Sequence, residues 1–211
     1  MESKTFWDAV KARRSIYALD DTPIVPESRI EEIAADTLRY LPSPYNSQST
    51  RLQLLFGEAH KALWTLTLDI LREKTSPKKF PATEEKIRTC FMSGYGTVLF
   101  YVDKEAVDAL TAQFPLYAER FALWSQHSCA MHQFVMWAAL EAEGLGASLQ
   151  HYNPLIDDAV KRRWNVPASW QLVAQMPFGR PVAAPDDKDV LPIELRLTVR
   201  RDAGEDAGEA E

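Results

Sequence analysis

Two arginines and a serine in the stretch ARRSIYAL, residues 12–19, are the first side chains that could bind a charged ligand. Arginine presents a planar fork of donors that matches phosphate oxygens, and serine adds a short hydroxyl donor. Arg13, Arg14 and Ser15 could therefore hold an anion. The alternative is that cations near the end of a helix are stabilised by the helix dipole alone.

A polar loop precedes the first strand-like run of the chain. In LPSPYNSQSTR, residues 41–51, most positions favour turns, and the apolar run LQLLF follows directly. Asn and Gln side chains each carry a donor and an acceptor. Asn46 and Gln48, together with Ser43, could therefore bind the edge of a heterocycle that alternates carbonyl groups and ring nitrogens. The alternative is a capped surface turn.

A third candidate is GLGASLQHY, residues 144–152, where two glycines would let the backbone approach a ligand closely. This is no dinucleotide fingerprint, because the third glycine is missing and the stretch follows a helix. His151 could donate a proton, or it could be a hydrogen-bonded core histidine. His127 and His132 are five residues apart, so they do not share a helix face as two zinc ligands would. The sequence contains no GxSxG, GxxxxGK[ST] or HExxH motif.

Composition narrows the class of protein. The chain has 211 residues and a net charge of −6, which disfavours duplex nucleic acid as a partner. It has no run of about 18 apolar residues, so we expect no membrane span. The N-terminal segment lacks the apolar core of a secretory signal. Cys90 and Cys129 give neither a disulfide framework nor metal-ligand spacing, so a cytoplasmic location is expected.

The elements that must position these side chains follow from hydrophobic periodicity. Their order fits an α/β or α+β layer fold around a small sheet. Residues 1–200 are predicted to form one domain, with a proline-rich arm at 178–192, and residues 201–211 an acidic, disordered tail. Predicted caps are Ser3, Ser28 with Glu31, Gly144, and Asn153 followed by Pro154. Helices are predicted at 3–14, 28–40, 58–74, 83–92, 115–144 and 154–163, strands at 52–56, 97–102, 147–152, 169–177 and 194–200, and a link ending at Pro115.

Four stretches in a fixed order identify a family. ARRSIYAL, LPSPYNSQSTRLQLLFG, EGLGASLQHYNP and MPFGRPV make the chain resemble the FMN-dependent nitroreductases, in particular the branch related to yeast fatty-acid repression mutant protein 2. The resemblance runs from about residue 5 to residue 200. It implies an α+β, nitroreductase-like fold: a small, mostly antiparallel sheet flanked by helices, a long central helix, and an intertwined homodimer with FMN at the interface.

The resemblance also implies roles for individual residues. Arg13, Arg14, Ser15 and Lys188 would hold the phosphate and ribityl chain of FMN; Ser43, Asn46 and Gln48 would come from the partner subunit and edge the flavin; and Gln150, His151 and Tyr152 would pass the ring face. Tyr17 stands near the ring where many family members have Lys or Arg, and Val190 stands where many have a second basic residue. Tyr45, Tyr152 and Trp124 are candidates to shape the acceptor pocket by stacking.

The implied activity is hydride transfer from NADH or NADPH, through FMN, to a nitroaromatic or related small aromatic electrophile. One site that serves two ligands in turn predicts ping-pong kinetics, and no side chain need act as a nucleophile. Two alternatives stay open. The first is a non-catalytic flavin-binding regulator of lipid or redox signalling on the same fold, and the second is a helical interaction protein without a cofactor.

Overall fold

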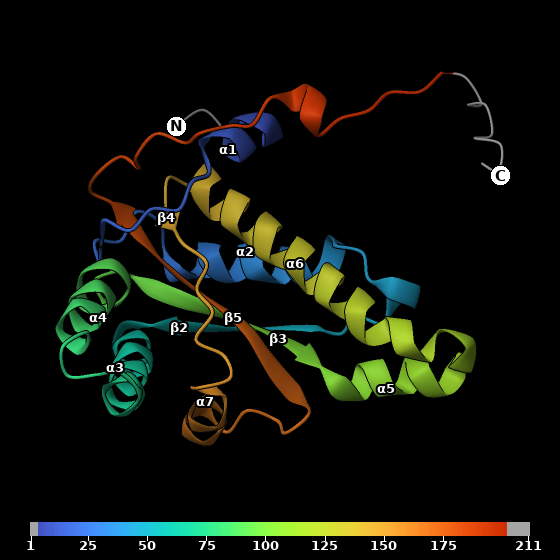
Figure 1. Cartoon of the computed structure of the whole chain (residues 1–211), viewed down its shortest axis with the longest axis horizontal. Coiled ribbons are helices and arrows are strands. Elements are labelled where there is room, and N and C mark those ends of the chain that lie inside the picture. Colours follow the sequence, from blue (N-terminus) through green and yellow to red (C-terminus); the bar gives the residue numbers. More distant parts are fainter. Residues whose placement is uncertain (1–3, 202–211) are drawn as a thin grey trace, which may run out of the picture.

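A five-stranded sheet in which all pairs are antiparallel forms the centre of the protein (Figure 1). The computed structural model describes residues 4–201. The strands run in the order β1-β5-β3-β2, and β4 also pairs with β5. The α+β class predicted from sequence is therefore confirmed. The strands are β1 (Leu19–Asp20), β2 (Thr50–Phe56), β3 (Gly96–Asp103), β4 (Gly146–Ala147) and β5 (Trp170–Pro181).

Helices cover both faces of this sheet. Figure 1 shows α2 and α6 above it and α3 and α7 below it. Every residue of β3 is buried, because its alternate side chains enter two separate cores. Val98 and Phe100 pack in the core that contains Met136 of α6, whereas Leu99 packs with Trp64 of α3. The helices are α1 (Phe6–Ala12), α2 (Glu27–Tyr40), α3 (Gly57–Lys74), α4 (Phe80–Ile87), α5 (Lys104–Gln113), α6 (Ala118–Ala142) and α7 (Asp157–Trp164).

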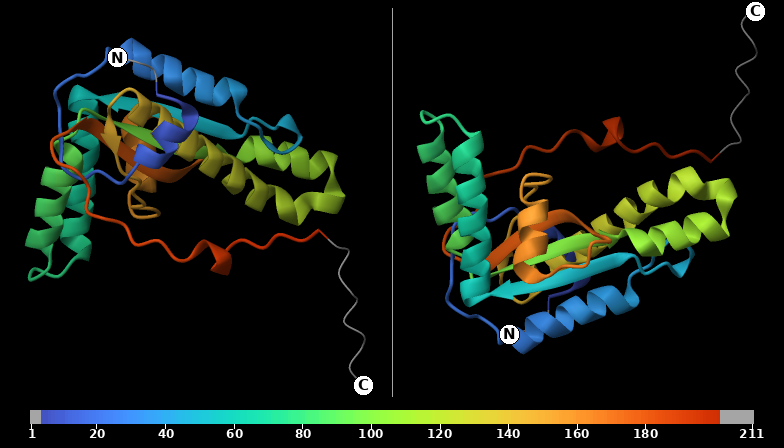
Figure 2. Two further views of the ribbon diagram at one scale, coloured as in Figure 1. Left: turned by 90° about the horizontal axis from the view of Figure 1, so that it is seen from above. Right: turned by 90° about the horizontal axis from the view of Figure 1, so that it is seen from below.

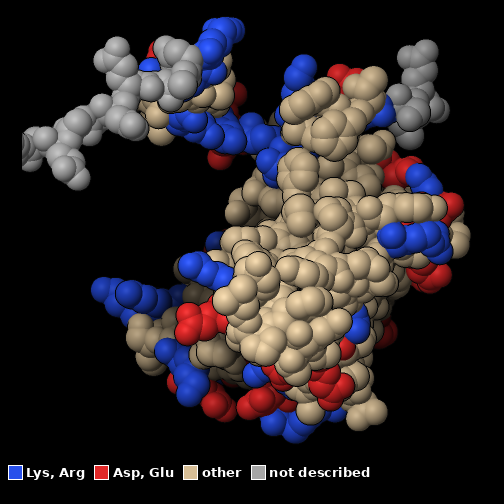
Figure 3. Space-filling view, turned by 90° about the vertical axis from the view of Figure 1, so that its right-hand side faces the viewer, with Lys and Arg blue, Asp and Glu red and all other residues tan. Residues whose placement is uncertain are grey.

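The C-terminal arm extends away from this layered body. After β5 the chain runs without regular structure, apart from one short turn at Ile193–Leu195, to Arg201 (Figure 2). Figure 3 shows the arm standing clear of the body, and charged side chains lying mostly around a largely uncharged α5–α6 end. The strand predicted at 194–200 is therefore absent from the described part of the chain.

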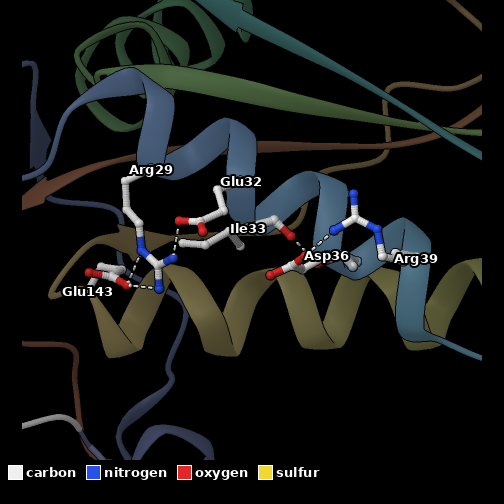
Figure 4. A network of polar contacts seen from close by, with 7 residues as sticks. Arg29, Glu32, Ile33, Asp36, Arg39 and Glu143 are labelled. Atoms are coloured by element: carbon white, nitrogen blue, oxygen red, sulfur yellow. Dashed lines mark hydrogen bonds and ion pairs between the residues drawn. The ribbon is translucent and has the colours of Figure 1, made fainter.

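The C-terminal end of the long helix α6 lies beside the first turn of α2. Nε of Arg29 in α2 donates to Glu143 Oε1 at 2.8 Å, and the same guanidinium pairs with Glu32 (Figure 4). These contacts are partly exposed, so they contribute little stability. Gly144 follows with φ of +87°, a left-handed conformation that suits glycine, and this confirms the predicted helix end. The chain then turns directly into β4.

Several predicted helix starts are wrong, although the helices exist. Helix α2 begins at Glu27 after Pro26, so Ser28 lies inside it and makes no capping box with Glu31. Helix α1 is capped by Thr5, whose hydroxyl accepts from the backbone N–H of Asp8. The predicted cap Ser3 and most of the predicted acidic tail lie outside the described residues.

The second half of the chain holds the larger corrections. The predicted link that ends at Pro115 contains helix α5, which the Asp103 carboxylate caps by accepting from the N–H of Glu105 at 3.1 Å. The strand predicted at 147–152 is reduced to β4 and one bridge between Gln150 and Gln175. Helix α7 starts at Asp157, and Asn153 is not its cap. The helix predicted at 83–92 is α4 followed by a π-helical turn at Arg88–Met92. No helix in residues 4–201 is long and apolar enough to cross a membrane.

Candidate functional site

The end of α1 and the C-terminal arm form one cavity. It has a volume of about 440 Å³ and is lined by Arg13–Ala18 and Ala183–Lys188. Two backbone hydrogen bonds fix its walls: Ile16 N–H donates to the carbonyl of Ala147 at 2.9 Å, and Val182 N–H donates to that of Ala18 at 2.9 Å. The structure therefore brings Arg13, Arg14 and Ser15 together with Lys188, which lies 173 residues after Ser15 in the chain.

Two guanidinium groups in this cavity lack carboxylate partners. Neither Arg13 nor Arg14 forms an ion pair with any residue in the range 4–201, and Nε of Arg13 is buried with no hydrogen-bond acceptor there. Arg14 donates to the backbone carbonyl of Asp186 at 2.5 Å and so ties the arm to α1. Burial, followed by the neighbouring charge of Arg14, lowers the pKa of Arg13. Two adjacent, uncompensated cations with a free buried donor fit a phosphate group.

A second cavity of about 450 Å³ lies beside the first. Arg14, Ile16 and Ala183–Pro185 line both, and the second adds Trp137, Glu141 and the turn at Gly144–Ala147. Oε2 of Glu141 is buried and has no partner among the described residues, while its Oε1 pairs with Lys4. The first cavity is the better phosphate site, because it alone contains the buried Nε of Arg13 that has no acceptor among the described residues, although Asp186 and Asp187 also line it.

The loop before β2 has a strained backbone. Tyr45, Asn46 and Gln48 all have positive φ, at 49°, 53° and 47°. Such conformations are unfavourable for residues with side chains and concentrate at ligand sites. Ser43 Oγ accepts from the N–H of Gln48 at 2.9 Å, so the loop is also the capped turn that the sequence left open. Tyr45 is 53% exposed, and its ring lies 4.6 Å from the ring of Phe114, centroid to centroid.

Gln175 holds the segment that was predicted to face the flavin ring. Its side chain accepts from the N–H of Tyr152 at 2.8 Å and donates to Asn153 Oδ1 at 3.0 Å, and it is fully buried. His151 is exposed, which excludes the alternative of a core histidine. Tyr152 is half-buried between Trp64 and Phe91. Burial, and to a smaller extent the charge of the nearby Cys90 thiolate, raises the pKa of Tyr152 to about 12. Its ring is therefore part of an aromatic cluster.

One chain does not bring all predicted site residues together. The loop at 43–48 approaches α6 near Ser128, whose hydroxyl donates to the carbonyl of Pro42 at 3.0 Å, whereas Arg13 packs on Trp137. Trp137 lies nine positions after Ser128 on the helix, which corresponds to about 14 Å along the axis. Ser43, Asn46 and Gln48 accordingly line none of the cavity that holds Arg13. Within one chain, the loop at 43–48 therefore lies apart from the cavity that holds Arg13.

The buried cysteine and histidine of α6 do not form a catalytic pair. Cys129 accepts from Nε2 of Gln133 at 3.5 Å, and burial raises its pKa to about 11, which keeps the thiol unreactive. His132 Nδ1 lies 2.7 Å from the carbonyl of Ser128, and burial lowers its pKa. No group of three or more His, Cys, Asp or Glu residues in the described range could hold a metal ion.

Three residues of the site had no signal in the sequence. Trp137 supports the Arg13 guanidinium, Gln175 fixes residues 150–153, and Lys86 reaches Tyr17 from α4. All three lie in helices or strands whose hydrophobic pattern predicts only whether a residue is buried or exposed, and not whether it contacts a ligand. Lys188 and Tyr17 both line the cavity that holds Arg13, Arg14 and Ser15.

Comparison with known proteins identifies the class. The model of the family described as "Nitroreductase family" matches residues 10–180. The protein HBN1 of Saccharomyces cerevisiae is 33% identical over 197 residues, covering 92% of this chain and 96% of the relative. The nitroreductase FRM2 of the same yeast is 31% identical over 189 residues, covering 87% and 91%. The chain therefore belongs to the nitroreductase family of oxidoreductases, and the predicted family and branch are confirmed.

Solved structures agree with this assignment. The nitroreductase CinD of Lactococcus lactis, in complex with chloramphenicol, superposes with a TM-score of 0.86 at 35% identity, covering 93% of this chain and 100% of that one. CinD has also been solved with 4-nitrophenol and with nicotinic acid. A nitroreductase-fold protein of Exiguobacterium sibiricum in complex with FMN has a TM-score of 0.71 at 15% identity, covering 95% and 99%, which shows the shared fold alone.

Proposed function

We propose that this chain is an FMN-dependent oxidoreductase that uses NADH or NADPH to reduce nitroaromatic or related electrophilic acceptors. The observation that carries this proposal is the cavity in which the buried Nε of Arg13 has no acceptor in the described chain, beside Arg14, Ser15 and Lys188. These groups would hold the phosphate and ribityl chain. Bound FMN would supply the redox chemistry, taking a hydride from the nicotinamide and passing it to the acceptor in a ping-pong cycle.

The side chains of this protein would bind and orient. Arg13 and Arg14 would supply charge-assisted hydrogen bonds to the phosphate, and the Ser15 hydroxyl would add a third donor. Gln175 would keep the backbone of Gln150, His151 and Tyr152 fixed along the ring, since it bonds to both ends of that segment. No titratable side chain is required to act as a nucleophile, in keeping with the unreactive environment of Cys129.

We also propose that the active form is an intertwined homodimer. Ile193, Leu195, Leu197 and Val199 alternate along the arm and are each 59–73% exposed, although such side chains are normally covered. Strand β2 ends the sheet with one free edge, which could accept another strand. A second chain would cover the apolar arm and would give residues 194–200 the strand partner they lack. It would also deliver Ser43, Asn46 and Gln48 to the flavin edge.

Aromatic side chains support the proposed acceptor class. Tyr45, Phe114, Tyr117 and Phe121 form one contiguous ring cluster at the α5–α6 end, next to the strained loop, and Trp124 extends it. Flat electron-poor rings stack well on such surfaces. CinD, at 35–36% identity, binds chloramphenicol and 4-nitrophenol, both of which are nitroaromatic.

A cytoplasmic location stays a prediction from the sequence.

The test uses purified full-length protein reconstituted with FMN. We expect flavin absorbance to co-elute with a dimer, oxidation of NADPH or NADH with 4-nitrophenol or chloramphenicol as acceptor, and parallel double-reciprocal plots. A flavin-loaded dimer that never oxidises either nucleotide would favour the regulator instead. A colourless protein that stays free of FMN would refute the whole proposal and favour an interaction protein.

A further inference from the structure

An unpaired ammonium group lies over the aromatic row beside the phosphate cavity. Nζ of Lys86, on α4, is 5.8 Å from the ring centroid of Tyr17 and 5.8 Å from that of Phe91. The two rings are 6.4 Å apart, so the cation sits over both. Tyr17 itself lines the cavity that holds Arg13, Arg14 and Ser15.

The same row of rings leads to the segment along the proposed flavin face. Phe91 lies 6.3 Å from Tyr152, centroid to centroid, and Tyr152 directly follows Gln150 and His151. Tyr17, Phe91 and Tyr152 therefore connect the phosphate end of the site with its ring end. Lys86 lies over Tyr17 and Phe91, the two rings of this row that are closest to the phosphate end.

Lys86 has no carboxylate partner in the part of the chain that the structure describes. Its neighbours on α4 are otherwise engaged: Glu84 accepts from Arg88 at 2.8 Å and faces Arg72 at 3.9 Å. Glu85 makes no ion pair with Lys86. The lysine is exposed, so it is free to approach a ligand that enters over Tyr17. A cation held on aromatic faces rather than by a carboxylate keeps its full charge available.

We infer that Lys86 supplies positive charge to the flavin ring of bound FMN, and so favours the reduced cofactor over the oxidised one. This inference rests on the proposed function. The oxidised ring is neutral, whereas the two-electron-reduced ring is an anion near neutral pH. A nearby fixed charge therefore stabilises one redox state selectively, which is one of the ways a protein tunes a flavin.

The test measures the midpoint potential of FMN bound to the full-length holoprotein, by titration against a reference dye. We expect Lys86→Met to weaken binding of reduced FMN about tenfold relative to oxidised FMN, which corresponds to a potential about 30 mV more negative for a two-electron couple. Lys86→Arg should keep the wild-type potential. Tyr17→Lys added to Lys86→Met should restore part of the loss, because it returns a cation to the same side of the cavity.

Lys79→Met is the matched control, since Lys79 is an exposed lysine beside the start of α4 that contacts no ring of the site. It should leave the potential unchanged. An unchanged potential in Lys86→Met, or equal weakening of both redox states, would overturn the inference while leaving FMN binding and the proposed function intact. If Lys86→Met fails to fold, Lys86→Gln gives the same comparison. A wild-type protein that binds no FMN would instead refute the proposed function.

Discussion

The guanidinium carbon of Arg13 lies 4.4 Å from the centroid of the Trp137 indole ring. The contact joins the residue after α1 to the last part of α6, two elements that the chain separates by more than a hundred residues. The ring covers one face of the guanidinium and removes water from it, while Nε is left with no acceptor in the described chain. A desolvated cation with an unused donor is prepared for an anion, and that property can be tested.

Removing any one of the three cationic side chains Arg13, Arg14 and Lys188 should weaken FMN binding. Each charge-assisted hydrogen bond to phosphate contributes about 1.5 to 3 kcal/mol, so Arg13→Ala, Arg14→Ala and Lys188→Ala should each raise the Kd for FMN roughly ten- to 150-fold. Fluorescence titration of the apoprotein measures this. Arg180→Ala is the control, because Arg180 pairs with Asp20 and does not line the cavity. Wild-type affinity in all three variants would remove the phosphate assignment.

A glycine substitution in the strained loop at 45–48 should stabilise the fold but weaken FMN binding. Gln48 has φ of +47°, so Gln48→Gly should raise the free energy of unfolding by about 0.5 kcal/mol while it weakens FMN binding to the dimer. Asn165→Gly is a matched control, since Asn165 has φ of +48° at the end of α7 and belongs to no proposed site. Urea unfolding and FMN titration check both variants. Equal FMN affinity in the two would argue against a role for Gln48.

Much of this architecture could be predicted from periodicity. The apolar run at 97–102 predicts a buried strand and the repeat at 115–144 a long buried helix, and both are present as β3 and α6. The predicted helix boundaries were wrong where two neighbouring residues both favour a helix start. Pro26 and Ser28 both suit a helix start, and the chain uses the earlier position. Helix α5 was missed because it buries only Val107 fully and so has a weak apolar face.

The site was only partly predictable for a different reason. Arg13 and Ser15 are neighbours in sequence, so a short motif identifies them, whereas Trp137, Gln175 and Lys86 reach the site through tertiary packing alone. The strand predicted at 194–200 shows a further limit. Its alternating pattern suits a strand, but in the described chain those residues pair with no strand of the sheet.

Polar substitutions on the arm should dissociate the proposed dimer. Leu195 and Leu197 are 73% and 59% exposed, so replacing both with Ser should leave the folded core unchanged and shift sedimentation towards the monomer. FMN should be lost in parallel, because Asn46 and Gln48 would no longer reach the flavin edge. Leu155→Ser is the control, as Leu155 is also exposed but lies beside α7, away from the arm. An arm variant that stays dimeric would contradict the intertwined arrangement.

Protonation of His60 should destabilise the fold at mildly acidic pH. Trp64 Nε1 donates to Thr97 Oγ1 at 3.0 Å, which leaves the threonine hydroxyl to donate to His60 Nδ1 at 2.8 Å, and His60 Nε2–H donates to the carbonyl of Met92 at 3.2 Å. The histidine is therefore neutral, and burial lowers its pKa from 6.5 to about 4.

Since the unfolded chain binds the proton more readily, the free energy of unfolding should fall as the pH drops from 6.5 to about 4, by about 3 kcal/mol, and level off below that. Urea unfolding at several pH values measures the slope, and subtracting the curve of His60→Leu isolates this histidine from His132, whose pKa burial also lowers. If His60→Leu retains the full acid sensitivity, the neutral network of His60, Thr97 and Trp64 is not its source.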